Sequence, residues 1–371
     1  MNAPGPIVPA PTQARLHGLH QIERKLLWLS AWTIHNANHI RPNRDGLKVG
    51  GHQASCASVI SIMTALYFDI LRPQDRVAVK PHAGPVFHAI NWLFGRGDQA
   101  RMHDLRKMGG LQSYPSRVKD GPEVDFSTGS VGLGVAMTSF SALMQDYVRL
   151  HGLSRPDLPP GRHIAIAGDA ELDEGNIYEC LIECFKHDIR NCWWIVDYNR
   201  QSLDSTTADR MFRRFDDIFE TCGWRVETLK QGKIQRATFA KPGGAAIGEW
   251  IDNCPNAEFA ALTYQGGAAW RERLERDLAG SPKSLKLIAS HDDGALATLM
   301  TNLGGHCIET LLEAFARCDD ERPTLFIAYT IKGRGLPVEG HPGNHSALLS
   351  PEQYVELAAR LGQDPDDPWR C

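Results

Sequence analysis

The chain has 371 residues, of which 42% are hydrophobic and 23% are charged, as in ordinary globular proteins. Its net charge of −4 provides no basic field for nucleic acid, and we expect no apolar run as long as the roughly 18 residues of a membrane span. Residues 1–13 begin with a Pro- and Ala-rich stretch that predicts a flexible lead-in and not a signal peptide. Nine irregularly spaced cysteines then predict free thiols in a cytoplasmic protein.

The first third of the chain predicts helices around one short strand. Apolar residues recur at helical spacing over residues 15–40 and 53–70, and again over residues 86–94. Residues 76–79 predict a strand, and the polar residues 111–123, with their Pro and Gly, predict a loop. Residues 132–150 predict a helix with almost no polar side chain in its first two turns, so we expect that helix to be buried.

Short apolar strands alternate with helices through much of the remainder. The predicted strands are 163–167, 192–197, 224–227 and 324–330, and the predicted helices are 171–187, 209–222 and 308–318. This alternation predicts an α/β fold, a doubly wound and mainly parallel sheet with helices on both faces. Residues 230–302, with one charged helix near 270–278, are interpreted as an excursion within a single domain of residues 14–349. Residues 350–371 predict a C-terminal helix and tail.

Two polar residues follow directly on predicted strands, where open parallel sheets bind their ligands. Asp169 and Asn199 are 30 residues apart, the length of one strand–helix–strand unit. If the two strands are neighbours, a carboxylate and an amide oxygen converge as hard ligands for Mg²⁺ or Ca²⁺. The amides after Gly168 should open a helix that favours phosphate. Either residue alone could be a helix cap or a turn residue, but the spacing favours the metal site.

With these residues in place, the chain resembles the thiamine-diphosphate enzymes, and in particular the homodimeric-type pyruvate dehydrogenase component, a relative of transketolase. The similarity covers roughly residues 20–350, and the motifs occur in the family's order. They are residues 50–55 (GGHQAS), 111–115 (LQSYP), 128–134 (TGSVGLG), 168–174 (GDAELDE), 199–204 (NRQSLD), 218–220 (IFE) with 223–224 (GW), 304–306 (GGH) and 330–333 (TIKG).

The resemblance implies a set of cofactor-binding residues. Mg²⁺, for which Ca²⁺ or Mn²⁺ could substitute, would be bound by Asp169, Asn199 and the backbone carbonyl of Gln201. Thiamine diphosphate would be lined at its diphosphate by Gly168, Ala170 and Glu171, and at its aminopyrimidine ring by Gly129 and Val131. The family usually has Gly where this chain has Ala170, so we expect binding to survive with a risk of reduced affinity.

The resemblance also implies residues near the reacting atoms. His52 and His82 match histidines that face the thiazolium ring and the substrate, where imidazole can move protons and stabilise an oxyanion. Ser55 and Tyr114 match residues near the same place. His345 matches a histidine on a mobile loop of the family, although its flanking residues diverge.

Two further patterns have competing interpretations. Cys180, Cys184 and His187 recur on one helix face and could bind a soft metal, but buried packing is the preferred interpretation because no second ligand pair accompanies them. The glycines at 129, 132 and 134 could suggest a dinucleotide site, yet their spacing is reversed from the usual fingerprint.

Full-length members of the family also carry a pyrimidine-binding domain, whose glutamate activates the cofactor. We therefore expect a split enzyme in which this chain is the alpha subunit of an α₂β₂ heterotetramer and a partner subunit supplies that glutamate. The expected reaction is cleavage of a 2-oxo acid, pyruvate above all, with transfer of the two-carbon unit to a lipoyl or carrier-protein thiol. Two alternatives stay open: transketolase-type transfer of a ketol unit from a ketose phosphate, and a non-catalytic cofactor-binding or regulatory subunit.

Overall fold

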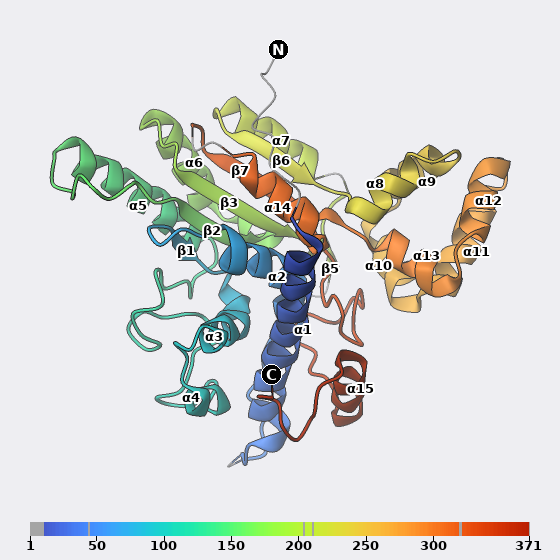
Figure 1. Ribbon diagram of the computed structural model, residues 1–371, viewed down its shortest axis with the longest axis horizontal. Helices are drawn as coiled ribbons and strands as arrows, with labels where there is room; N and C mark the ends of the chain where they lie inside the picture. Colours follow the sequence, from blue (N-terminus) through green and yellow to red (C-terminus); the bar gives the residue numbers. More distant parts are fainter. Residues whose placement is uncertain (1–10, 44, 203–204, 210, 319–320, 371) are drawn as a thin grey trace.

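The computed structural model describes residues 11–43, 45–202, 205–209, 211–318 and 321–370. Its centre is a five-stranded sheet in the order β1-β2-β3-β7-β6, in which every pair of neighbours is parallel (Figure 1). The strands are β1 (Arg76–Ala78), β2 (His163–Gly168), β3 (Cys192–Tyr198), β6 (Arg225–Leu229) and β7 (Thr324–Tyr329). A separate two-stranded hairpin pairs β4 (Gln201–Ser202) with β5 (Ser205–Thr206).

Helices cover both faces of the sheet, because its central strands are apolar on both sides. Successive side chains of a strand point to opposite faces. Trp193 therefore belongs to a hydrophobic core with α1, α2, α3, α14 and α15, whereas Trp194 belongs to a core with α5, α6 and α7. The predicted doubly wound α/β fold is confirmed. The covering helices are α1 (Gln13–His35), α2 (Gln53–Ala65), α3 (Gly84–Leu93), α5 (Leu133–Leu150), α6 (Gly175–Lys186), α7 (Phe212–Thr221), α14 (Ile308–Ala316) and α15 (Pro351–Leu361), and a short α4 (Gln99–His103) lies beside α3.

One helical segment is more apolar than the sequence analysis allowed. Residues 53–70, which comprise α2 and a π-helical turn η2 (Leu66–Ile70), are long and apolar enough to cross a membrane by composition alone. The expectation that no run reaches this length is therefore wrong. However, 78% of this window is buried inside the protein, so α2 is a core helix of the domain.

The expectation that the helix over residues 132–150 is buried is also wrong for one of its faces. Val135, Thr138 and Ala142 of α5 are buried, but an apolar stripe on the same helix is exposed. The stripe comprises Leu133, Phe140, Met144, Tyr147 and Leu150. Its continuous hydrophobicity indicates a second contact surface, which nothing in the described part of this chain covers.

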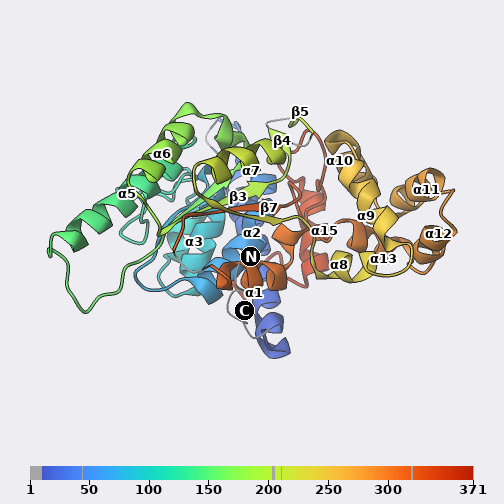
Figure 2. The same ribbon diagram turned by 90° about the horizontal axis from the view of Figure 1, so that it is seen from above.

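Between β6 and α14 the chain forms a group of short helices to one side of the sheet (Figure 2). These helices are α8 (Lys233–Phe239), α9 (Gly244–Asn253), α10 (Asn256–Gln265), α11 (Gly267–Asp277), α12 (Pro282–Ala289) and α13 (Asp293–Met300). Sequence analysis identified only α11, because helices of 7 to 11 residues separated by Gly and Pro are too short to show a clear period. Trp270 anchors the group, with its ring 5.3 Å from that of Phe259.

The C-terminal segment packs on the first helix. Tyr354 of α15 stacks on Trp28 of α1 with ring centroids 5.0 Å apart. The Lys25 ammonium donates to the carbonyl oxygen of Pro368 at 2.9 Å and to Oε1 of Gln363 at 2.9 Å. The hydrophobic core therefore continues beyond residue 349. Residues 1–10 of the expected lead-in, residues 203–204 of the NRQSLD motif and Cys371 lie outside the described residues.

Candidate active site

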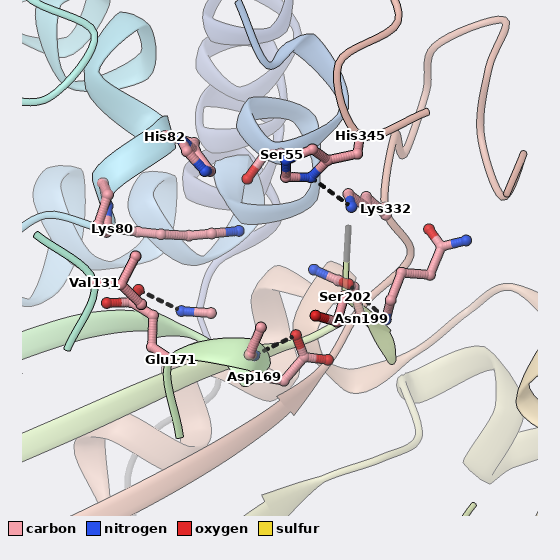
Figure 3. Close-up of a pocket in the computed structure, with 14 residues that line it drawn as sticks. Ser55, Lys80, His82, Val131, Asp169, Glu171, Asn199, Ser202, Lys332 and His345 are labelled. Carbon is pink, nitrogen blue, oxygen red and sulfur yellow. Dashed lines mark hydrogen bonds between the residues drawn. The ribbon is translucent and has the colours of Figure 1, made fainter. Parts of the chain in front are cut away.

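A cavity of about 150 Å³ lies beyond the carboxyl ends of β1, β2 and β3 (Figure 3). Ten of the residues predicted from the sequence line it, together with four that were not predicted. The lining residues are Ser55, Lys80, Pro81, His82, Val131, Gly168, Asp169, Ala170, Glu171, Asn199, Gln201, Ser202, Lys332 and His345. Segments far apart in the sequence thus converge at the sheet edge where the strand-end rule places ligands.

Asp169 and Asn199 lie at one end of this cavity because β2 and β3 are hydrogen-bonded neighbours, as their spacing predicted. The backbone N–H of Arg200 donates to Oδ2 of Asp169 at 2.6 Å. The N–H of Gln201 donates to Oδ1 of Asn199 at 3.0 Å. Arg200 has a φ of +64°, so a left-handed residue makes the turn that brings this loop back to the end of β2.

The Asp169 carboxylate is in a site that favours a cation. Burial and, to a lesser extent, the neighbouring Asp197 carboxylate together raise its pKa to about 7. Both polar atoms of the Gln201 side-chain amide are buried and have no hydrogen-bond partner among the described residues. The buried carboxylate of Asp169 beside the amide oxygen of Asn199 fits Mg²⁺, which would restore the charged form of Asp169.

The segment after Gly168 differs from the predicted helix. A 3₁₀ turn η4 (Asp169–Asp173) comes first, and α6 begins only at Gly175. Glu171 explains the interruption, because Oε1 accepts from the N–H of Gly168 at 2.9 Å and Oε2 accepts from the N–H of Gly132 at 2.9 Å. Its carboxylate therefore ties two glycine turns together, and the expectation that a helix opens at Gly168 is wrong.

Ala170 fits its position without backbone strain. Arg106, Asp188 and Arg200 are the only described non-glycine residues with a positive φ, so Ala170 needs no glycine-like conformation. Its N–H donates to Oδ1 of Asp169 at 3.0 Å. The methyl group thus replaces the family's usual glycine while the backbone contact to the candidate metal ligand is kept.

A buried ion pair lies beside the candidate metal ligands. Lys80 Nζ lies 2.6 Å from Oδ2 of Asp197, with side-chain exposures of 6% and 0%. Burial acts to lower the pKa of Lys80, but the Asp197 carboxylate outweighs it and raises this pKa. Asp197 also accepts from Ser58 Oγ at 2.6 Å and from the Thr330 hydroxyl. The cavity therefore keeps a charged ammonium group among its lining atoms.

Three histidines gather near the end of the cavity away from Asp169. The rings of His52 and His82 stack with centroids 3.8 Å apart, and His345 approaches His52 edge-on at 5.0 Å. Burial, with a smaller contribution from neighbouring positive groups, lowers the pKa of His52 to about 4 and that of His82 to about 3. Near neutral pH the imidazoles of His52 and His82 are uncharged, and each can both donate and accept a proton.

Lysines are the main site residues that sequence reasoning missed. Lys332 Nζ lies 3.2 Å from Nδ1 of His345 and lines the same cavity as Lys80. Both lysines follow shortly after strand ends, those of β7 and β1. The rule that selected Asp169 and Asn199 could therefore have found them, had it been applied to every strand.

Three predicted residues do not line the cavity. His52 is held beside it by its stacking on His82, and the ring of Tyr114 lies 5.4 Å from that of His82. Gly129 is exposed, and no heavy atom lies within 4 Å of where its Cβ would be, although Val131, two residues later, does line the cavity. Gly129 therefore does not line this cavity, and its contact with the aminopyrimidine ring stays a prediction.

The cysteine pattern on α6 is explained by packing, as the preferred interpretation held. Cys180 and Cys184 are buried in the hydrophobic core, and the described cysteines form no disulfide. His187 points to solvent, where Nε2 lies 3.4 Å from the Glu183 carboxylate. The three side chains therefore do not converge on a soft-metal site.

The curated proteins similar to this chain include pyruvate dehydrogenase E1 components and transketolases. No family model matches this chain. It is 24% identical over 360 residues to the pyruvate dehydrogenase E1 component of Corynebacterium glutamicum, covering 91% of this chain and 38% of that protein. It is 25% identical over 209 residues to the 6-deoxy-6-sulfo-D-fructose transketolase subunit SqwG of a Clostridium species, covering 53% of this chain and 73% of that protein. The chain thus spans about two fifths of the dehydrogenase component.

Solved structures agree on the fold. Transketolase from Campylobacter jejuni matches with a TM-score of 0.62 at 18% identity, and transketolase from Leishmania mexicana with 0.64 at 15% identity. Each match covers 94% of this chain, with 43% and 42% of the respective transketolase. The solved structures therefore show that this chain has the α/β fold found in these transketolases.

Proposed function

We propose that this domain of the transketolase superfamily binds the diphosphate of thiamine diphosphate through Mg²⁺ and forms half of an active site that cleaves a 2-oxo acid. The observation that supports the proposal is a single cavity lined at one end by Asp169 and Asn199, with the stacked rings of His52 and His82 at the other. Asp169, Asn199 and the carbonyl of Gln201 would hold the metal. Bound thiamine diphosphate supplies the carbon nucleophile and electron sink for cleaving the bond beside a ketone carbonyl.

The chain's own residues would bind the anionic group and handle protons. Lys80 keeps positive charge among the lining atoms, which offsets the charge of a diphosphate. His52 and His82, uncharged near pH 7, would donate a hydrogen bond to a developing oxyanion and accept a proton from a donor hydroxyl or acid. These roles need no movement of the sheet, since each residue lies at or just after a helix start or strand end.

A short anionic donor such as pyruvate is supported by the charge near the histidines. Lys332 lies beside His345 on the cavity wall, where an ammonium group can bind a carboxylate next to the reacting carbonyl. The pyruvate dehydrogenase components among the relatives agree with this donor class. The two-carbon unit would then pass to a thiol on a lipoyl or carrier protein.

Ketol transfer from a ketose phosphate is the second candidate. The similarity to SqwG, whose name describes a transketolase subunit, favours ketol transfer. The match covers 73% of SqwG, a larger share than of the dehydrogenase components. The same cationic groups would then bind a phosphate in place of a carboxylate. The fold and the cavity are compatible with both reactions, so an assay of donor specificity is needed to distinguish 2-oxo acid cleavage from ketol transfer.

We further propose that a pyrimidine-binding partner, such as a β subunit in an α₂β₂ assembly, covers the exposed apolar stripe of α5. The stripe begins at Leu133, two residues from the cavity-lining Val131, and α6 beside it adds the exposed Ile182 and Phe185. An exposed apolar surface of this kind marks an interface. A domain docked there would reach the cavity and could present the activating glutamate to the cofactor.

The experiment for the first proposal is calorimetry of the chain with thiamine diphosphate in MgCl₂ and in EDTA. We expect saturable binding in Mg²⁺ that EDTA abolishes. The tagged chain, recovered with its native partner, would then be assayed with pyruvate and with xylulose 5-phosphate, and an Asp169→Asn chain recovered in the same way is the control. Turnover of xylulose 5-phosphate but not of pyruvate would favour ketol transfer. Cofactor binding without turnover of either donor would favour a non-catalytic role. Normal turnover by the chain without its partner would refute the proposal that a partner subunit is required.

The interface has a matched pair of variants. Met144 on α5 and Val355 on α15 are both 56% exposed, so a glutamate at either position costs little in the isolated chain. We expect Met144→Glu to lose association with the partner and the activity that depends on it, while Val355→Glu keeps both. Equal behaviour of the two variants would contradict docking on α5.

A further inference from the structure

A second cavity, of about 250 Å³, lies on the other side of the turn at residues 199–201, between the ends of β3 and β7 and the helices α9 and α10. It shares no lining residue with the candidate active site. Its lining residues are Tyr198, Arg200, Asp209, Phe212, Lys230, Ile251, Asp252, Asn253, Cys254, Asn256, Leu303 and Tyr329. Asn199 and Gln201 line the first cavity while Arg200 between them lines the second, so this turn separates two sites.

The charge in this second cavity is incompletely paired. Lys230 Nζ lies 2.6 Å from Oδ1 of Asp252, and Asp209 accepts a hydrogen bond from the N–H of Asn256 at 2.9 Å. The guanidinium group of Arg200, in contrast, makes no hydrogen bond or ion pair with any residue that the structure describes, and its Nε is buried. It stacks on the ring of Phe259 at 4.3 Å and lies 5.7 Å from that of Tyr329.

Aromatic contact compensates the half-buried guanidinium group only in part, because its buried Nε–H has no acceptor among the described residues. The hydroxyl of Tyr329, a residue that is 3% exposed, is likewise buried and has no hydrogen-bond partner in the described part of the chain. Unpaired buried donors of this kind cost free energy unless a ligand supplies acceptors. A carboxylate satisfies both groups at once, by a bidentate contact to guanidinium and one hydrogen bond from the phenol.

The walls indicate the body of such a ligand. The rings of Tyr198, Phe212 and Tyr329 meet here, with centroids 4.9 Å apart for the two tyrosines and 5.7 Å for Phe212 and Tyr329. The volume is below the roughly 300–1,000 Å³ of pockets that take drug-sized ligands, so the occupant is small. We infer that this cavity is a binding site for a small organic carboxylate with a planar or apolar body, held by Arg200 and Tyr329.

Occupancy of this site would act on the candidate metal loop through one residue. The N–H of Arg200 donates to Oδ2 of Asp169, and its left-handed φ sets the turn that presents Asn199 and Gln201. A carboxylate that fixes the Arg200 side chain would favour this turn, and binding of the carboxylate and of the cofactor would strengthen each other equally. This coupling rests on the proposed function, whereas the carboxylate site itself does not.

The test is calorimetry of benzoate, acetate and inorganic phosphate against the full chain, first without Mg²⁺ and thiamine diphosphate. We expect saturable benzoate binding that is tighter than that of acetate or phosphate, because only benzoate fills the aromatic walls. Arg200→Met should weaken it at least tenfold, and Tyr329→Phe, which keeps the ring, several-fold. Arg214→Met, which removes a cation from the exposed face of α7, should leave it unchanged.

The carboxylate site would be overturned if benzoate does not bind saturably, or if Tyr329→Phe and Arg200→Met both bind benzoate with wild-type affinity. Tighter binding of phosphate than of benzoate would also overturn it. If Arg200→Met does not fold, Tyr329→Phe decides, since it removes only an unpartnered hydroxyl. Benzoate should also tighten Mg²⁺-dependent binding of thiamine diphosphate several-fold in the wild-type chain. Benzoate binding without any cofactor binding would contradict the proposed function and support the carboxylate site. Cofactor binding without benzoate binding would support the proposed function and contradict the carboxylate site.

Discussion

Lys80 Nζ and Asp197 Oδ2 lie 2.6 Å apart, and neither side chain is more than 6% exposed. Lys80 follows β1, and Asp197 is in β3, so the pair links two strands that are separated by β2 in the sheet. Hydroxyl groups from α2 and from the end of β7 complete the contacts of Asp197. The pair therefore fixes the position of the cavity's cation and the spacing of the strand ends that carry the candidate metal ligands.

Removal of the ammonium group should destabilise the fold as well as the site. Lys80→Met leaves Asp197 buried without its cation, which typically costs about 3–5 kcal/mol. Urea unfolding measures the loss. The double variant Lys80→Met/Asp197→Asn carries no uncompensated charge and should recover a substantial part of it. A single variant as stable as the wild type would show that the hydroxyl donors alone satisfy Asp197.

Asp169→Asn should stabilise the metal-free protein at alkaline pH while it abolishes metal binding. Burial and Asp197 raise the pKa of Asp169 to about 7, against an unfolded value near 3.9. Between those values the folded state binds the extra proton, so stability falls as pH rises from about 4 to 7. At pH 8 we expect the variant to be more stable by about 1–4 kcal/mol. Thermal unfolding with and without Mg²⁺ tests both parts, since only the wild type should be stabilised by the metal.

His163 should contribute to acid unfolding. Both of its ring nitrogens are buried without partners among the described residues, and burial lowers its pKa to about 4. The unfolded chain binds a proton below about pH 6.5 that the folded chain refuses, so stability falls as pH drops from about 6.5 to 4. The loss attributable to this residue is about 3 kcal/mol at pH 4.

His163→Leu should flatten that part of the stability profile, measured by urea unfolding at pH 7, 6, 5 and 4. His187→Leu is the control, because His187 has a side-chain exposure of 48%. An unchanged slope in His163→Leu would mean that other groups cause the acid sensitivity.

The sheet and half of the site could be predicted from the sequence because both rest on local patterns. Apolar strands such as residues 192–198 define a doubly covered sheet, and the strand-end rule then places Asp169 and Asn199 side by side. The exposure of one face of α5 could not be predicted, since an apolar pattern does not show whether a face packs against the same chain. It was also not predictable that the turn at residues 199–201 lines two cavities. Arg200 has a left-handed φ and lines the second cavity, whereas Asn199 and Gln201 line the first, and a sequence pattern does not reveal this φ.

Ala170→Gly tests the one departure from the family pattern inside the diphosphate motif. Its φ is not in the left-handed region, so glycine relieves no strain and gains only unfolded-state entropy. We expect a loss of stability of about 0.4–1 kcal/mol and a change in the thiamine diphosphate Kd of less than about threefold, because the contact to Asp169 Oδ1 comes from the backbone N–H. Calorimetry in Mg²⁺ measures the Kd. A gain in affinity of tenfold or more would show that the methyl group of Ala170 obstructs the diphosphate. That result would support the alternative of a non-catalytic subunit.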